Sequence, residues 1–437
     1  MKIKYCALVF MIIQVFYTHG QLDLTLTGTD HLWQKNLINP SFQTDDNLTI
    51  SLPALQFGFY HSGDPFKDVW KVEGNTLFLD TKEWLDNLDE RNDVFSQFEL
   101  PTLHLAHRSG DMVWSIGHTF RNNAVINYRK DLISLVHEGN ATMIGESMDL
   151  DTDVEWTSFS AFHFGLSWEI DNLTVGGRFS YLSGIQYLDT PQEHVSLYTD
   201  EEAYQLEFNT DYKIRSSSFI TAEDLSALNF EFTGLETFKL LTENAGMSVD
   251  LGATLKFGDN WKAEASVLDL GFINWKDVAS YRSQGTFVYE GVEVDDLADF
   301  DSLSFEETLD TIGNILGFEE VEEDDFRQNL SPRVYLGLSW QISPAWSVRG
   351  VYANASIRDE GFSAFGLGTQ YEILDWWHVG TMVSRKFERW HWGFNTDVRL
   401  GFVQVYFATD NVLSVFDVKN LSSGNLRLGA NLVFAGD

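Results

Sequence analysis

The chain has little cysteine, little proline and few basic residues. It holds one cysteine, Cys6, and 7 prolines in 437 residues, and 29 Lys and Arg stand against 65 Asp and Glu. A disulfide framework needs paired cysteines and is therefore excluded. The net charge of −36 excludes nucleic acid as a partner, because binding it needs a basic surface. No Pro/Ser linker divides the chain into separate domains.

Long apolar runs are also missing after the first residues. Residues 1–20 have the pattern of a signal peptide, with Lys2 and Lys4, an apolar stretch over 5–17, and a cleavage site near Gly20/Gln21. The stretch is too short for a membrane-spanning helix, and Cys6 precedes it, whereas a lipoprotein cysteine would follow it. We therefore expect Sec export, and a protein that enters a membrane only through strands.

Alternation with a period of two is what the sequence has in abundance. In the run 333–342, every even residue is Val, Leu, Trp or Ile, whereas the odd residues are Arg, Tyr, Gly, Ser and Gln. The runs 247–257, 391–400 and 425–434 alternate in the same way. This period indicates β-strands, since successive side chains leave a strand on opposite faces. One face carries charges and the other carries Trp and Phe at strand ends, as in a membrane barrel.

The fold class predicted is all-β: a transmembrane antiparallel β-barrel of about fourteen strands, whose closure satisfies every backbone group in lipid. The predicted strands are 48–60, 95–108, 112–125, 155–170, 173–187, 246–257, 261–274, 333–342, 345–357, 361–373, 376–387, 390–400, 402–410 and 424–435.

Short and long connections alternate along these strands. Tight turns are expected at 109–111, 171–172, 258–260, 343–344, 374–375 and 400–401, and long loops at 61–94, 126–154, 188–245, 275–332 and 411–423. This arrangement is typical of outer-membrane barrels, with short turns in the periplasm and long loops outside the cell. Residues 48–437 would form the barrel. Residues 21–47, with Asn39 and Pro40, are either a periplasmic strap or a plug that enters the lumen.

Several stretches resemble a family of Bacteroidota outer-membrane β-barrels of unknown function. They are Asn39-Pro40-Ser41, Leu52-Pro53, 173–178, 269–275, 408–411 and the closing stretch 427–434. More distantly, the strand number and the Asn-Pro segment resemble the fatty-acid-transporter barrel class. That class includes hydrocarbon-uptake channels and barrel subunits of the type IX secretion machinery. The resemblance implies an outer-membrane location and an N-terminal hatch, and it implies no catalytic residue.

The inward face of the predicted strands collects charged side chains of both signs. They are Glu169, Arg178, Asp250, Lys256, Lys262, Glu264, Arg333, Arg349, Asp397, Arg399 and Arg427. One hypothesis makes them a polar conduit or a site for a ligand carboxylate, which arginine suits well. The alternative is a structural network of ion pairs that braces the lumen and holds a plug.

The stretch 290–326 contains acidic residues and no Lys or Arg. Within it, Phe305, Leu309, Ile312 and Leu316 recur at the spacing of one helix face. This helix would be a lid or a docking element at the cell surface, or a loop helix that packs on its own loop. The nearby acids Asp295, Asp296, Asp299 and Asp301 lack the spacing and the distal glutamate of a calcium loop.

Catalytic motifs are not evident. His118, Asn122 and either Ser158 or Ser160 would share the outer face of neighbouring strands, which is the composition of a lipid hydrolase. Ser, His and Asn are also ordinary residues at a membrane interface. The sequence contains no metal motif, phosphate loop or dinucleotide fingerprint, so we expect no enzyme, no cofactor and no metal.

Three functional hypotheses follow. The first is a passive, gated channel for a small apolar or amphipathic solute, since side chains and a plug leave little free bore in a barrel of this size. The second is a barrel that does not transport and instead docks secretion-system (type IX-like) or surface partners. The third is a lipid hydrolase. The expected partners are outer-membrane lipid, the barrel-assembly machinery, and a small solute or secretion proteins.

Overall fold

The computed structural model describes the chain from Leu22 to Ala435, with gaps. The described ranges are 22–63, 70–73, 76–79, 81–202, 205–217, 241–276, 278–289, 316–322, 325–357, 360–387, 389–413 and 423–435. The expected signal peptide therefore lies outside the described residues. Among the residues that are described, no helix has the length and apolar content needed to cross a bilayer.

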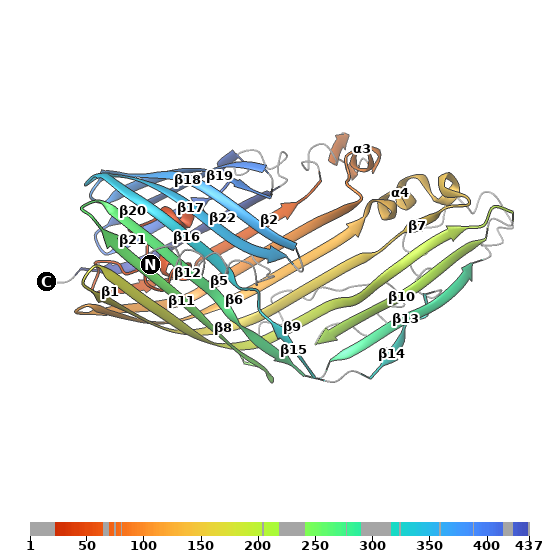
Figure 1. Cartoon of the computed structure of the whole chain (residues 1–437), viewed down its shortest axis with the longest axis horizontal. Coiled ribbons are helices and arrows are strands. Elements are labelled where there is room, and N and C mark those ends of the chain that lie inside the picture. The colour runs from red at the N-terminus through yellow and green to blue at the C-terminus, as the bar shows by residue number, and fades with distance from the viewer. Residues whose placement is uncertain are drawn as a thin grey trace, which may run out of the picture.

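Fourteen antiparallel strands close into a barrel, and the predicted fold class is confirmed (Figure 1). Counting β1 and β2 as one strand, they are β1 (Leu48–Ser51) with β2 (Leu55–His61), β5 (Arg91–Ser109), β6 (Met112–Arg129), β8 (Thr152–Ile170), β9 (Leu173–Thr199), β11 (Asn244–Phe257), β12 (Trp261–Trp275), β16 (Arg333–Ser343), β17 (Trp346–Ile357), β18 (Glu360–Leu374), β19 (Trp377–Lys386), β20 (Arg389–Leu400), β21 (Val403–Thr409) and β22 (Ser423–Phe434).

The first and last strands close the barrel. β22 pairs with β1 from Leu48↔Phe434 onward and with β2 from Leu55↔Leu428 onward, while both β1 and β2 also pair with β5. Pro53 separates β1 from β2, because proline has no N–H to donate to a ladder. The backbone bonds of Leu52 to Ala430 and of Ala54 to Pro101 continue the pairing on either side. The N-terminal strand is thus hydrogen-bonded on both edges.

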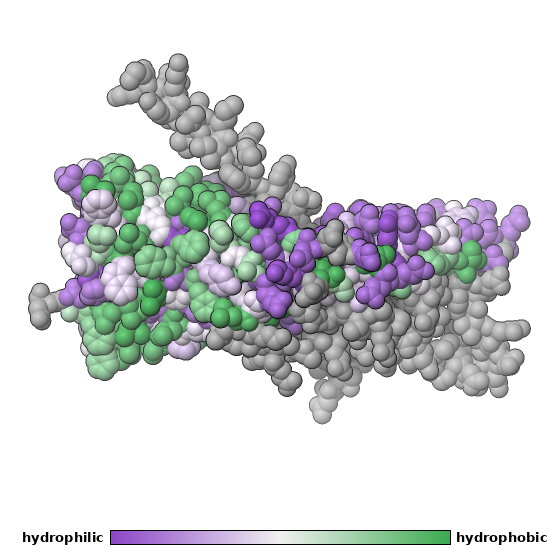
Figure 2. All heavy atoms as spheres, turned by 90° about the horizontal axis from the view of Figure 1, so that it is seen from below, coloured by the Kyte–Doolittle hydropathy of each residue, from purple (hydrophilic) through white to green (hydrophobic). Residues whose placement is uncertain are grey.

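The barrel wall has an apolar outer face and a polar inner face. Leu367 exposes 70% of its surface and Leu338 exposes 46%, whereas the lumen-facing Arg349 exposes 5%. Figure 2 shows hydrophobic residues gathered over the barrel and hydrophilic residues over the part that projects from it. At the turn end of the barrel, which carries the tight connections predicted above, aromatic rings stack on the outer face, as Trp261 does on Trp340 at 5.8 Å. This distribution suits a wall that faces lipid.

At the opposite end, the wall continues into an extension built from the outer half of β9 and the segments around it. These segments are β7 (Ser147–Asp149), β10 (Leu206–Ser217), β13 (Ala279–Tyr289), β14 (Glu319–Val321), α4 (Lys130–Glu138) and η3 (Asn140–Met143). The remaining elements are η1 (Thr25–Gly28), η2 (Trp33–Leu37), β3 (Trp70–Glu73), β4 (Thr76–Leu79), α3 (Thr81–Asp86) and β15 (Phe326–Asn329). Figure 1 shows the extension running away from the barrel.

The predicted loops 188–245 and 275–332 contain strands of the extension, so their predicted boundaries are wrong. The strand end expected near residue 187 is wrong, because β9 continues to Thr199 and pairs there with β10, which in turn pairs with β13. Its buried residues include Leu197 and Phe208, so this sheet has an apolar cluster of its own. β10 alternates as the barrel strands do: its even positions from 206 to 214 are Leu, Phe, Thr, Tyr and Ile, and its odd positions are Glu, Asn, Asp and Lys. The predicted loops therefore contain strands.

Candidate functional site in the barrel lumen

The N-terminal segment, residues 22–47, lies against the inner face of the barrel. Its leucines Leu22, Leu24 and Leu26 are at most 2% exposed. They belong to one buried apolar cluster that also contains Ile38, Leu268, Tyr335, Val351, Ala353, Ala355, Ala364 and Met382. Alanines on the lumen face of β17 and β18 leave room for the leucines. The two η turns are too short to show a helical period, which is why no pattern in the sequence predicted this packing.

The Asn39-Pro40-Ser41 stretch rests on glycines of β9 and β11. A Cβ at Gly176 would lie 2.2 Å from the carbonyl oxygen of Pro40, and one at Gly252 would lie 2.2 Å from Asn39 Oδ1. Ser41 Oγ donates to Asn39 Oδ1 at 2.8 Å and also lies 2.8 Å from Thr254 Oγ1. Only a residue without a side chain fits at these two wall positions, because the segment occupies the space.

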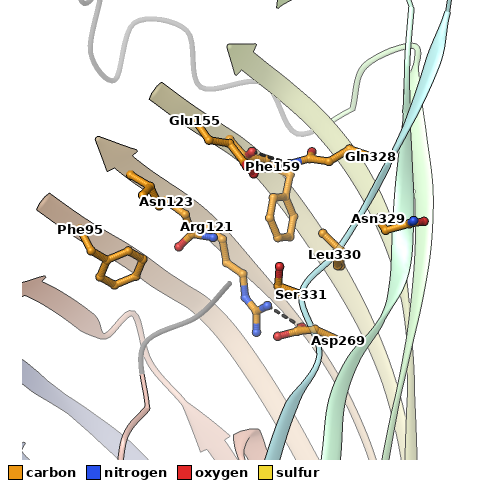
Figure 3. A pocket seen from close by; sticks show the side chains of 12 residues that line it. Phe95, Arg121, Asn123, Glu155, Phe159, Asp269, Gln328, Asn329, Leu330 and Ser331 are labelled. Carbon is orange, nitrogen blue, oxygen red and sulfur yellow. Dashed lines mark hydrogen bonds and ion pairs between the residues drawn. The ribbon is translucent and has the colours of Figure 1, made fainter. Parts of the chain in front are cut away.

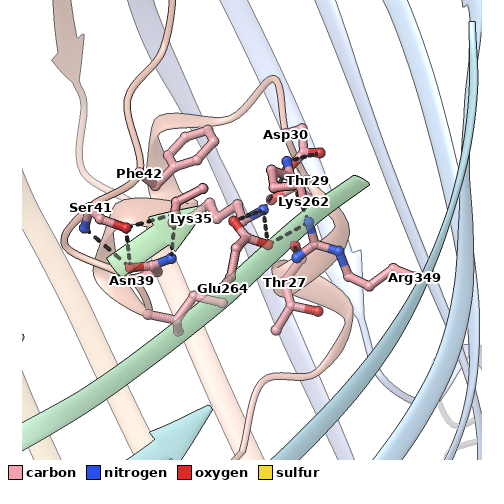
Figure 4. A network of polar contacts seen from close by, with 12 residues as sticks. Thr27, Thr29, Asp30, Lys35, Asn39, Ser41, Phe42, Lys262, Glu264 and Arg349 are labelled. Atoms are coloured by element: carbon pink, nitrogen blue, oxygen red, sulfur yellow. Dashed lines mark hydrogen bonds and ion pairs between the residues drawn. The ribbon is translucent and has the colours of Figure 1, made fainter. Parts of the chain in front are cut away.

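The first charged cluster joins the segment to β12 and β17 (Figure 4). Lys35 Nζ lies 2.9 Å from a carboxylate oxygen of Glu264, and Arg349 lies 2.6 Å from the other. Asp30 binds Lys262 at 2.6 Å and also pairs with Lys35. Lys35 and Glu264 are buried, so each charge depends on its partners.

A second charged cluster, nearer the extension, joins side chains of β5, β6, β12 and β16 inside the barrel. Asp269 accepts from Arg121 and from Arg333 at 2.7 Å each, and Arg121 Nε lies 3.3 Å from Glu99. Of these four residues, only Arg333 was predicted from the sequence. Arg121 lies in a predicted strand with inward parity, so the same rule would have found it. Asp269 was not predictable from parity, because it sits at a register irregularity with φ +61°.

Two further ion pairs hold the beginning of the segment to the last strands. Arg427 lies 2.8 Å from Asp23, and Gln56 Nε2 donates to the same carboxylate at 2.7 Å. Lys386 lies 2.9 Å from Asp410, whose other oxygen accepts from the backbone N–H of Thr25 at 2.8 Å. The beginning of the segment is therefore bonded to β2, to β22 and to the residue that follows β21, where the first and last strands meet.

The remaining predicted lumen charges also have partners. Arg178 binds Asp250 at 2.7 Å and donates to the carbonyl oxygens of Asn36 and Leu37. Asp397 accepts from His378 at 3.0 Å and from Gln404 at 3.1 Å. Two pairs lie at the turn end and are partly exposed, Lys256 with Glu169 and Arg399 with Asp46, both at 2.9 Å. The inward charges thus form pairs or networks, many of which include the N-terminal segment.

A cavity of about 50 Å³ lies beside the second cluster (Figure 3). Its apolar lining is Phe95, Val125, Phe159 and Leu330, and its polar lining includes Arg121, Asp269, Glu155 and Gln328. Sites for small organic ligands usually measure about 300–1,000 Å³. A cavity of this volume among the described residues has room for a few water molecules and is too small for an organic solute. None of the described lining residues belongs to the N-terminal segment, so an organic solute would need the lining side chains to move.

The wall next to this cavity is irregular. β12 pairs with β16 as far as Leu268↔Arg333, and it pairs with β15 from Phe272↔Asn329. Between these points the ladder is interrupted, apart from the bond of Leu330 N–H to the Gly271 carbonyl. The register of β11 with β12 also shifts at this level. The cavity therefore adjoins the part of the wall where the β12–β16 ladder is broken.

The residues of the hydrolase hypothesis lie on neighbouring strands, as their parity requires. Asn122 is opposite Ser158 and donates to its Oγ at 2.5 Å, but His118 is opposite Phe162 and its Nδ1 lies 2.9 Å from Thr102 Oγ1. Both Ser158 and Ser160 are at most 1% exposed. A serine nucleophile needs access to its substrate, so this arrangement lends the hypothesis no support.

The predicted loop helix is mostly outside the described residues. Phe305, Leu309 and Ile312 lie there, as do the acids 295–301 considered for calcium. Leu316 is described, and it packs against the apolar cluster of the extension. Its carbonyl oxygen accepts a hydrogen bond from Ser283 of β13 at 2.5 Å.

Comparison with known proteins gives a family and a set of similar barrels. Residues 40–410 match a model described as Family of unknown function (DUF5723), and no curated protein matches the chain. The toluene transporter TbuX of Ralstonia pickettii is 11% identical over 91% of this chain and 92% of its own, with a TM-score of 0.46. The toluene transporter TodX of Pseudomonas putida is 11% identical over 96% of this chain and 98% of its own, with a TM-score of 0.42. A FadL homologue of Pseudomonas aeruginosa is 9% identical over 96% of this chain and 100% of its own, with a TM-score of 0.32. With TM-scores below 0.5, these similarities do not bear on function.

Proposed function

The chain belongs to the family DUF5723, whose description names no activity, and we propose that it is a passive, gated channel of the outer membrane for a small apolar or amphipathic solute. The observation that carries this proposal is the N-terminal segment on the inner face of the barrel. It contributes both to the apolar cluster and to the charged clusters of the lumen. A barrel that served only as an anchor would have no need of such an inner element.

In this proposal the N-terminal segment is the gate. It joins the wall at the turn end, where the backbone N–H of Asn47 donates to the Phe434 carbonyl. Besides its apolar contacts, the segment is held to the wall by hydrogen bonds and ion pairs. Such bonds can be exchanged for bonds to water at a net cost of about 0.5–1.5 kcal/mol each. The segment can therefore leave the wall in steps, whereas the strands of the closed ladder cannot.

The cavity of Figure 3 supports an apolar or amphipathic solute. Phe95, Phe159 and Leu330 offer apolar surface, while the Arg121–Asp269 pair offers charge beside it. Sites of this composition hold the apolar body of a ligand and orient its polar group. Because the cavity is small, an organic solute would enter it only when the lining side chains move, and it would cross the rest of the lumen only when the segment moves, which makes the channel gated.

The test is a deletion of residues 22–46 that keeps the leader and the cleavage site. The purified variant should show the heat-dependent gel mobility of a folded barrel and a higher single-channel conductance than the wild type, because the lumen would lose its inner element. Folded protein with the wild-type conductance would remove the segment as the gate.

The sidedness of the channel has its own test. An epitope inserted at the Asp259 turn should be labelled only after the outer membrane is permeabilised. An epitope at Glu202, in the exposed turn between β9 and β10, should be labelled on intact cells. The reverse pattern would place the extension in the periplasm and overturn the proposed orientation.

The extension favours a second candidate function, a barrel that docks surface or secretion partners. A channel has no evident need of a sheet that projects beyond the barrel with its own apolar clusters around Leu188 and Leu197. Under this function, the deletion of 22–46 leaves conductance unchanged, and cross-linking from Glu202 on intact cells captures a defined protein. Under the channel function, the deletion raises conductance.

A further inference from the structure

Three neighbouring strands place a histidine between two carboxylates at the turn end of the lumen. In the register of the wall, Glu372 of β18 is directly opposite His378 of β19, and His378 is directly opposite Asp397 of β20. Side chains that face each other across neighbouring strands lie about 4.5–5.5 Å apart at Cβ. The outward residues beside them, such as Tyr371 and Trp377, are exposed on the other face of the sheet. The three polar groups therefore form a row on the lumen face.

The N-terminal segment adds a second histidine to this row. The ring of His31 stacks on the ring of His378, with centroids 3.6 Å apart and planes 8° from parallel. Gln404 holds the backbone of His31 in place by donating to its carbonyl oxygen at 3.0 Å. In the part of the chain that the structure describes, the ligand atoms of His31, Glu372 and His378 all lie within 4.8 Å of one another.

Asp397 sets the chemistry of His378. Its carboxylate oxygen lies 3.0 Å from Nδ1 of His378, and Gln404 donates to the same oxygen at 3.1 Å. A carboxylate at Nδ1 keeps the proton on that nitrogen and leaves the lone pair on Nε2. This is the carboxylate–histidine arrangement that orients metal-binding histidines in proteins.

We propose that His31, Glu372 and His378 bind one divalent transition-metal ion, zinc being the ion that this donor set fits best. Two imidazoles and a carboxylate, with a fourth position for water, are a common zinc set. In a tetrahedral zinc site the ligand atoms lie about 3.3 Å apart, so the group must contract and the stacked rings must open. His31 is exposed, and its ring is able to turn toward the ion. Asp397 is a positioning residue.

The ion would fasten the N-terminal segment to the wall. His31 belongs to the segment, while Glu372 and His378 belong to strands, so one bound ion links the two parts. This inference holds whether or not the barrel conducts, because it concerns only the attachment of residues 22–47. No run in the sequence indicated it, since His31 lies more than 300 residues before Glu372 and His378, and the three residues form no motif.

The experiment uses the full mature protein, purified in detergent, stripped with a chelator and titrated with zinc. We expect one zinc per chain by calorimetry and by metal analysis after desalting. His31→Ala, Glu372→Gln and His378→Gln should each lose this stoichiometric zinc. Asp397→Asn should keep the stoichiometry and weaken the affinity about 10–100-fold. The matched control is His107→Gln, a histidine that contacts Trp114 near the same end of the barrel.

A second measurement separates binding from folding. Heat-dependent gel mobility reports the closed barrel, and His31 lies outside the strands, so His31→Ala should fold even where a strand variant does not. Zinc should slow hydrogen exchange of the amides of 28–32 in the wild type and leave it unchanged in His31→Ala. One zinc retained by both His31→Ala and Glu372→Gln, or no zinc bound by the wild type, would overturn the site.

Discussion

The two faces of strand β16 have opposite requirements. Leu338 points outward and exposes 46% of its surface, whereas Arg333 points inward and exposes 4%. Lipid accepts any apolar side chain, so the outer face needs no particular neighbour. A buried charge needs a particular partner at a particular distance, as Arg333 has in Asp269 at 2.7 Å. The outer face is therefore specified by composition, and the inner face by pairing.

The largest expected effect comes from removing a partner inside. Glu264 lies between Lys35 and Arg349, so Glu264→Gln leaves Asp30 as the one carboxylate shared by these two buried cations in the part of the chain that the structure describes. Breaking a buried pair in this way costs about 3–5 kcal/mol. We expect that loss in the free energy of unfolding, measured by urea titration in lipid vesicles. A loss below about 1 kcal/mol would mean that water solvates these charges, as in a polar conduit.

The outer face is tested on the same strand. Leu338→Arg places a charge near the middle of the lipid-facing wall and should cost about 2–4 kcal/mol. The control is Gly337→Ser on the inner face, where a Cβ would have only ordinary contacts at 3.7 Å and beyond. Equal unfolding free energies for the two variants would show that the faces are assigned the wrong way round.

A smaller effect is expected where the wall touches the N-terminal segment. Gly252→Ser places its Cβ 2.2 Å from Asn39 Oδ1, and overpacking of this kind costs about 1–3 kcal/mol. Because the segment is not part of the ladder, we expect it to shift and the single-channel conductance to rise. Gly337→Ser again serves as the control. Unchanged conductance with wild-type stability would mean that the segment does not rest on Gly252.

The smallest effect belongs to the rim. Lys256 pairs with Glu169 at the turn end, with 60% and 30% of their side chains exposed. Exposed pairs contribute about 0–1 kcal/mol, since water screens them. Lys256→Ala should therefore change the free energy of unfolding by less than 1 kcal/mol. A loss comparable to that of Glu264→Gln would show that the pair is buried in the membrane-embedded protein.

This contrast explains how much the sequence could predict. The strands and their parity followed from alternation, because lipid imposes one rule on every outward residue. The partners of Arg333 or Lys35 could not be predicted, since Asp269 sits at an irregularity and Asp30 lies outside any strand. The leucines of the N-terminal segment lie in short turns with no period. β10 of the extension alternates as the barrel strands do, so it was predictable from the sequence, and it was missed because the whole of 188–245 was assigned to a loop.

The bonds of the N-terminal segment to the last strands also constrain the order of assembly. Thr25 bonds to Asp410 and Asp23 pairs with Arg427, contacts that span most of the chain, as does the closing pair Leu48↔Phe434. Contacts between residues far apart in sequence form late, because the entropy cost of closing a long loop comes before the favourable free energy of the contact. The first described residues of the chain are thus among the last to reach their final places. Until β22 arrives, Asp23 and Lys35 must be kept in water or held by another protein, so the slow phase of folding should be the filling of the lumen.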